Sequence, residues 1–246
     1  MEYKIVGETM QALTIQLRQG EEVFAEAGSM LYMGEGIELD AKMQGGFLKG
    51  LARKFLAGES LFMSSFRCLT PQGKLALAAP ITGKIIPMEL KGTTILAERN
   101  AYLCSIGNID LSIAFTKKLG AGLFGGEGFI LQKISGHGMV FLHAGGNVIE
   151  FQLVAGEKLR VDTGCIVSMT ETVRYDIQYV GGFKNALFGG EGLFYASLEG
   201  PGHVVLQTLP FSRLADRMRA AMGGNAGQAQ GVAGFGGILK DVISGE

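Results

Sequence analysis

A six-residue motif occurs twice in this chain and limits how the chain can fold. The motif, Leu-Phe-Gly-Gly-Glu-Gly, stands at residues 123–128 and 187–192, and the offset of 64 residues continues through the apolar run that follows each copy. A shorter copy, Gly-Glu-Ser-Leu-Phe, stands at 58–62. A self-match at a fixed spacing is typical of chains built from repeated structural units. The sequence therefore predicts a single domain over residues 1–212, made of three units at about 1–92, 93–154 and 155–212.

Each copy of the motif predicts a β-hairpin. The glycines allow a sharp bend, and the Glu is followed by apolar, aromatic and β-branched residues. This run ends at a second glycine turn, at 136–138 in one copy and 200–202 in the other, where the next apolar run begins. Alternation of apolar and polar residues at 13–18 and 173–179 predicts further half-buried strands. We therefore expect an all-β fold, in which residues 93–154 and 155–209 superpose with their hairpins in register.

The motif places Glu59, Glu127 and Glu191 at equivalent positions in the three units. A carboxylate beside glycines can accept hydrogen bonds from their N–H groups and hold the turn. We expect this structural role. The alternative is that the repeated Gly-Glu turns bind a small molecule or serve a cryptic enzyme.

Composition narrows the class of protein. The chain has 39 Gly and only 5 Pro, which favours many turns over long helices, and its net charge of −1 argues against an electrostatic grip on nucleic acid. Three widely spaced cysteines, Cys68, Cys104 and Cys165, stand in apolar runs, which is typical of reduced thiols in an intracellular protein. Neither a secretory signal nor an apolar run long enough to span a membrane is evident. We expect a cytoplasmic protein.

The sequence offers little evidence for catalysis. Residues 120–125 fit the Gly-x-Gly-x-x-Gly pattern, but the run after them has a strand pattern where a dinucleotide site needs a helix. The histidines, His137, His143 and His203, lack the spacing of metal ligands on one strand. We therefore expect no catalytic residue, no metal and no cofactor.

Apolar and basic residues gather before each Gly-Glu turn. In the first unit Phe47, Leu51 and Phe55 are four residues apart, which predicts one face of a short helix over 45–56. Two alternatives remain open: the apolar side chains fill the core or a subunit contact, or they face a membrane surface or a partner protein. The other members of this predicted face are the basic residues Lys49, Arg53 and Lys54 and, in the later units, Phe124 and Phe188.

The end of the chain has a different composition. Residues 213–222 carry helix formers, with Ser212 as the expected N-cap. Residues 223–246 are rich in Gly and Ala and predict a flexible tail.

With these motifs in view, the chain resembles the "altered inheritance of mitochondria" family over residues 3–212. The residues that carry the resemblance are the three Gly-Glu turns and the run Gly-Pro-Gly-His-Val at 200–204. The resemblance implies a fold similar to the tryptophan RNA-binding attenuation protein, with three short double-stranded β-helix or β-sandwich units per chain and a ring-shaped homotrimer. Eukaryotic relatives are mitochondrial and linked to inner-membrane organisation. The resemblance thus favours a non-enzymatic oligomeric scaffold or binding module, at a membrane surface or on a partner protein.

Overall fold

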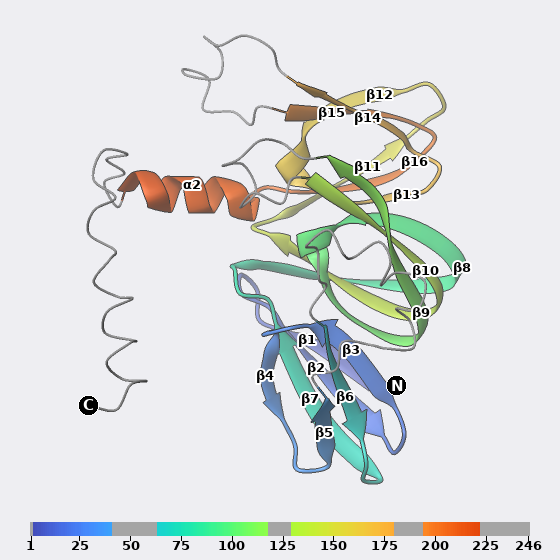
Figure 1. Cartoon of the computed structure of the whole chain (residues 1–246), viewed down its shortest axis with the longest axis vertical. Coiled ribbons are helices and arrows are strands. Elements are labelled where there is room, and N and C mark those ends of the chain that lie inside the picture. The colour runs from blue at the N-terminus through green and yellow to red at the C-terminus, as the bar shows by residue number, and fades with distance from the viewer. Residues whose placement is uncertain (1, 41–62, 118–128, 180–193, 222–246) are drawn as a thin grey trace, which may run out of the picture. The chain divides into compact units, whose positions relative to one another are not determined.

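The computed structural model describes residues 2–40, 63–117, 129–179 and 194–221. The chain divides into two compact parts, Met1–Ser212 and Arg213–Glu246. The described ranges of the first part are all-β, as expected (Figure 1). Its strands are β1 (Glu2–Val6), β2 (Ala12–Arg18), β3 (Glu22–Glu26), β4 (Met30–Met33), β5 (Ile37–Asp40), β6 (Met63–Cys68), β7 (Gln72–Ala78), β8 (Gly83–Glu98), β9 (Tyr102–Lys117), β10 (Phe129–Gly145), β11 (Val148–Leu153), β12 (Lys158–Asp162), β13 (Ile166–Thr170), β14 (Arg174–Tyr179), β15 (Phe194–Glu199) and β16 (Gly202–Gln207).

The strands form three sheets. Nine strands pair in the order β11-β16-β13-β8-β10-β9-β3-β6-β5, four in the order β1-β2-β7-β4, and three in the order β12-β15-β14. In Figure 1, β8, β9 and β10 lie between the strands β1–β7 and the strands β11–β16. The nine-stranded sheet therefore joins the beginning, middle and end of residues 1–212.

Alternation in the sequence decides which face of each strand is buried. In β2 the side chains of Leu13, Ile15 and Leu17 are buried, while the residues between them are half-buried. This confirms the strand predicted for residues 13–18. Across the described residues the buried apolar side chains form three clusters, one centred on β2, β3, β6 and β7, one on β8–β10, and one on β13–β16.

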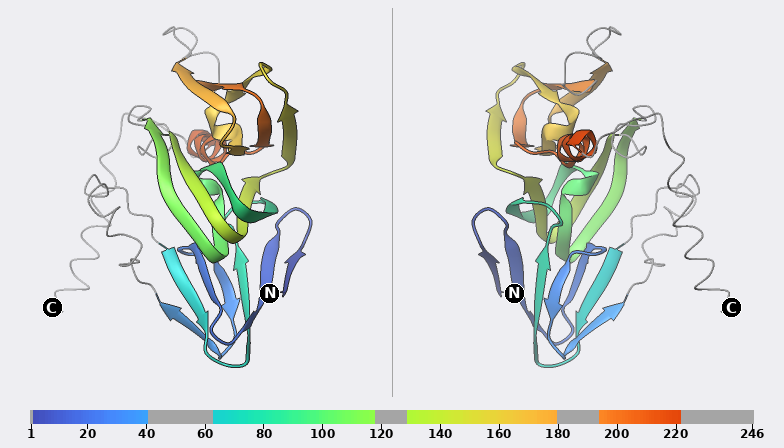
Figure 2. Two further views of the ribbon diagram at one scale, coloured as in Figure 1. Left: turned by 90° about the vertical axis from the view of Figure 1, so that its right-hand side faces the viewer. Right: turned by 90° about the vertical axis from the view of Figure 1, so that its left-hand side faces the viewer.

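The predicted turn at Gly136–Gly138 is wrong. Strand β10 runs through these residues, antiparallel to β8 on one side and β9 on the other, as the long green and yellow-green strands of Figure 2 show. The register with β8 shifts between Gly136 and His137, so the glycines mark an irregularity inside one long strand. A glycine pair can bend a strand without ending it, because neighbouring strands still pair with the backbone on both sides.

The predicted hairpin at 200–202 is also wrong. Strand β15 ends at Glu199 and β16 begins at Gly202, but the two strands do not pair with each other. Strand β15 pairs with β12 and β14, whereas β16 pairs with β11 and β13. The glycines here carry the chain from one sheet to another.

Replacing Gly136 with alanine should lower the free energy of unfolding by about 2–3 kcal/mol. Gly136 has φ +124°, and an added Cβ would lie 2.2 Å from the backbone oxygen of Asn108. The matched control is Gly156→Ala, where φ is +80° but no atom lies within 4 Å of the new Cβ. We expect that control to cost about 1 kcal/mol in chemical denaturation. Equal losses in the two variants would contradict the steric argument.

After the last strand the chain forms helix α2, Phe211–Ala221. The helix confirms the prediction of a short C-terminal helix, but it begins one residue before Ser212. Ser212 therefore lies in the first turn, and its predicted role as N-cap is wrong. No helix in the described part of the chain is long and apolar enough to cross a bilayer.

Candidate functional site

The residues that the sequence predicts for a site lie outside the described part of the chain. Their roles in turns, in a membrane face or in a partner contact therefore stay predictions. The residues are Glu59, Glu127, Glu191, Phe47, Lys49, Leu51, Arg53, Lys54, Phe55, Phe124 and Phe188.

Two other acidic residues, Glu98 and Asp162, stabilise short turns in the described structure. Glu98 precedes the 3-10 turn η3 (Arg99–Ala101), and its carboxylate accepts a hydrogen bond from the backbone N–H of Asn100 at 2.9 Å. Asp162 precedes the turn η5 (Thr163–Cys165) and accepts from the N–H of Gly164, also at 2.9 Å. Each carboxylate satisfies a backbone donor that the short turn leaves without a partner. These two turns are equivalent in geometry.

Glu98 is buried and interacts electrostatically with two half-buried residues, Glu26 and Arg99. Burial raises the pKa of the Glu98 carboxyl to about 7, and the charge of Glu26 adds to the rise. Burial also raises the pKa of Glu26 to about 7, and the Arg99 guanidinium partly opposes this effect. Near neutral pH, both carboxyls are therefore partly protonated.

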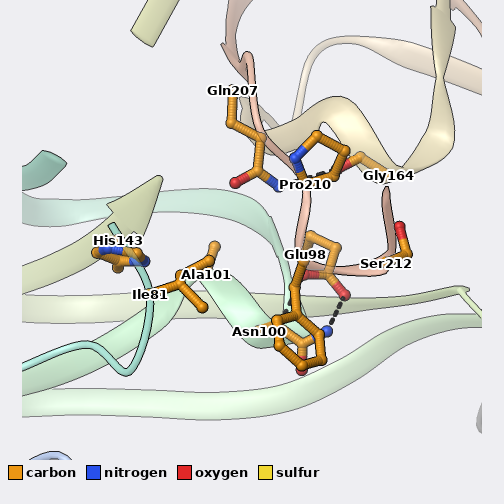
Figure 3. Close-up of a pocket in the computed structure, with 10 residues that line it drawn as sticks. Ile81, Glu98, Asn100, Ala101, His143, Gly164, Gln207, Pro210 and Ser212 are labelled. Atoms are coloured by element: carbon orange, nitrogen blue, oxygen red, sulfur yellow. Dashed lines mark hydrogen bonds between the residues drawn. The ribbon is translucent and has the colours of Figure 1, made fainter. Parts of the chain in front are cut away.

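A cavity of about 30 Å³ lies beside Glu98 (Figure 3). A cavity needs roughly 10–15 Å³ of such volume to hold one water molecule, so this one has room for about two. Small-molecule sites are usually about ten times larger or more. The cavity is lined by Ile81, Glu98, Asn100, Ala101, His143, Gly164, Gln207, Pro210, Phe211 and Ser212.

Two side chains of the cavity wall, Gln207 and His143, form hydrogen bonds with the backbone. The Gln207 amide donates to the carbonyl of Gly164 at 2.8 Å and accepts from the N–H of Gly145 at 2.7 Å. Burial lowers the pKa of His143, while a hydrogen bond to the backbone of Ile81 raises it in part. His143 is therefore largely neutral at neutral pH.

The geometry of the cavity does not assemble a nucleophile with a base. His143 forms a hydrogen bond with the backbone of Ile81, and the carboxylate of Glu98 accepts hydrogen bonds from Asn100. Neither side chain is directed at the Ser212 hydroxyl (Figure 3). Burial also raises the pKa of the Cys104 thiol far above neutrality, so this thiol stays protonated. Among the described residues, no group of three His, Cys, Asp or Glu side chains could hold a metal ion.

Sequence reasoning missed Glu98 and Asp162, although a signal was available. The two residues are 64 positions apart, the same offset that relates the Gly-Glu motifs, and both are acidic. The interaction of the half-buried Glu26 with Arg99 has no such signal, because the two residues lie far apart in the sequence. Only the fold brings them together.

Comparison with known proteins gives a family and a fold for this chain. The family model described as mitochondrial biogenesis AIM24 matches residues 3–209. An uncharacterized protein of Streptococcus pyogenes serotype M6 is 28% identical over 212 residues, which cover 83% of this chain and 84% of that protein. A crystal structure of a Streptococcus pyogenes protein has a TM-score of 0.74 and 23% identity, and the match covers 89% of this chain and 99% of that one. That likeness shows a shared fold, and the match to the family model shows that the chain belongs to the mitochondrial biogenesis AIM24 family.

Proposed function

We propose that this chain is a non-enzymatic oligomeric scaffold or binding module built from three repeated units. The observation that carries this proposal is strand β4, an apolar strand at the edge of a sheet in which all four residues are exposed. The proposal also places the protein in the cytoplasm, at a membrane surface or on a partner protein, without nucleic acid, metal or cofactor.

The register of three strand pairs supports the three repeated units. Strand β4 pairs with β7, β9 with β10, and β13 with β16 in one common pattern, in which the register shifts by one residue after the first pair. The shared pattern is an antiparallel pair with a single bulge at the same place. The opposite residues are Met30–Leu77, Tyr32–Ala76 and Met33–Leu75 in the first pair of strands, Tyr102–Leu142, Cys104–Phe141 and Ser105–Val140 in the second, and Ile166–Leu206, Ser168–Val205 and Met169–Val204 in the third.

Strand β4 differs from its two counterparts in exposure. Its four residues, Met30–Met33, are between 39% and 59% exposed. The counterparts in β9 and β13 are buried, because a further strand pairs with each of them. An exposed apolar strand with an open edge is a template for pairing with another chain. No described strand of the same chain pairs with this edge, so another copy of the chain is a candidate to cover it.

Self-association is the use of this edge that the proposal favours. The number of copies, three, follows from the resemblance to ring-forming proteins with the attenuation-protein fold. The alternative function, a small-molecule site or cryptic enzyme at the repeated Gly-Glu turns, concerns residues outside the described ranges. The cavity beside Glu98 gives that alternative little support, because it has room for about two water molecules.

Light scattering of the wild type at micromolar concentration should give the mass of a homotrimer, and Met33→Lys should give a monomer. A lysine in β4 places a charge on an apolar edge and blocks pairing there. The matched control is Met10→Lys: Met10 is 68% exposed, against 39% for Met33, but lies outside β4. We expect this control to stay oligomeric, and circular dichroism should show both variants folded. A monomeric wild type would refute the proposal.

A further inference from the structure

We infer that the open edge of β4 pairs with strand β12 of a second copy of this chain, antiparallel and with Met33 opposite Arg160. The inference rests on the proposed self-association and names the two surfaces that meet. It is drawn from the contacts that already join the units inside one chain.

Two contacts of one kind join the units within the chain. Strand β3 pairs with β9, and strand β8 pairs with β13, both antiparallel. In each case the strand that precedes an acidic turn pairs with the strand that follows the acidic turn of the next unit. The register is the same, with the opposite residues Val23–Ile106, Phe24–Ser105 and Ala25–Cys104 in the first contact and Ile95–Thr170, Leu96–Met169 and Ala97–Ser168 in the second.

One strand of each type is left without this partner among the described residues. Strand β12 precedes the acidic turn of the last unit and stands at the end of its three-stranded sheet. Strand β4 follows the first acidic residue, Glu26, and stands at the end of its four-stranded sheet. The contact made twice inside the chain joins a strand that precedes an acidic turn to a strand that follows one. Strand β12 is of the first type and strand β4 is of the second, so the two edges can form the same contact.

The internal contacts also fix the register of the missing one. We align the three acidic residues Glu26, Glu98 and Asp162 and apply the register of the two internal contacts to β12 and β4. This places Leu159 opposite Gly34, Arg160 opposite Met33, and Val161 opposite Tyr32. One step further, Lys158 comes opposite Glu35, so opposite charges meet at the end of the pair. Val161 is buried and Leu159 is half-buried in the single chain. The pairing would therefore add backbone hydrogen bonds and cover the exposed side chains of β4.

This contact joins two different surfaces, so it has a defined consequence for assembly. A head-to-tail contact either closes into a ring or continues as a filament, whereas pairing of β4 with β4 would give only a twofold dimer. The inference therefore predicts that each copy uses its β4 and its β12 at the same time.

Disulfide trapping tests the register directly. Met33→Cys and Arg160→Cys are made in separate chains with different tags and are co-expressed, then oxidised. Directly opposite residues in antiparallel strands have Cα atoms about 4.5–5.5 Å apart, which suits a disulfide. Both side chains are accessible, since Met33 is 39% exposed and Arg160 is exposed, so both variants should fold. Oxidised wild type controls for the native cysteines, of which Cys68 and Cys104 are buried.

We expect disulfide-linked dimers in the co-expressed pair and none in either variant alone. A chain that carries both substitutions should form a closed covalent ring, whose mass counts the subunits, or a ladder if the assembly is a filament. Dimers of Met33→Cys alone would show twofold β4 pairing and overturn the inference. An oligomeric wild type with no disulfide in the mixture would also overturn it, while leaving the proposed scaffold standing. A monomeric wild type would overturn both.

Discussion

Replacing Phe141 with alanine is expected to lower the free energy of unfolding by about 3–5 kcal/mol. Phe141 lies in β10, is 0% exposed, and packs in the cluster formed with β2, β3 and β7. Its ring also forms a T-shaped pair with the Tyr3 ring, with centroids 4.9 Å apart and an angle of 79° between the planes. Alanine would remove this contact and leave a cavity among strands that are paired on both sides and cannot collapse.

Urea denaturation at one protein concentration measures this loss, because assembly would add a term that depends on concentration. The control is Leu69→Ala, at a residue that is 52% exposed in the turn between β6 and β7, where we expect a change within about 0.5 kcal/mol. Tyr3→Ala separates the ring contact from the burial and should cost about 0.5–1.5 kcal/mol from the ring pair alone. A loss at Phe141 as small as that at Leu69 would contradict the placement of this ring in the core.

The second large effect is on the pH dependence of stability. The pKa of Glu98 is about 7 in the folded protein, against an ordinary value of 4.5. The folded protein therefore holds a proton over a pH range in which the unfolded chain has lost it. The free energy of unfolding should fall as pH rises from about 4.5 to 7 and then level off. One pKa unit corresponds to about 1.4 kcal/mol, so Glu98 contributes a fall of about 3 kcal/mol.

Glu98→Gln should remove this part of the pH dependence. The glutamine amide oxygen can still accept the hydrogen bond from Asn100, but the side chain carries no charge to bury. The variant should be more stable than the wild type at pH 8 and similar at pH 5, with the remaining slope due mainly to Glu26. Glu38→Gln changes an exposed carboxyl and serves as control. Parallel profiles for wild type and Glu98→Gln would show that the Glu98 carboxyl does not titrate as described.

Strands were predictable where one local signal decides them. Alternation predicted residues 13–18 because only one face of β2 meets the core. The glycines at 136–138 misled prediction, since glycine marks both turns and irregular strands, and only the neighbouring strands distinguish the two. The family, too, was recognisable from its motifs, and the match over residues 3–209 confirms it.

The candidate site was less predictable for a physical reason. The cluster of Glu26, Glu98 and Arg99 depends on which strands become neighbours, and no local pattern encodes that. The exposure of β4 has the same origin. Residues 30–33 are as apolar as the buried residues 166–169, so composition cannot tell which strand keeps an open edge.

The pairing of β3 with β9 has a consequence for the order in which the chain folds during synthesis. Strand β3 leaves the ribosome long before β9, and until then the edge that β9 will cover is open. The same holds for β8 until β13 is made. Pairings between such distant parts of a chain form slowly, because the loop between them must close first. Each of these two edges therefore stays open during synthesis until the strand that covers it has been translated.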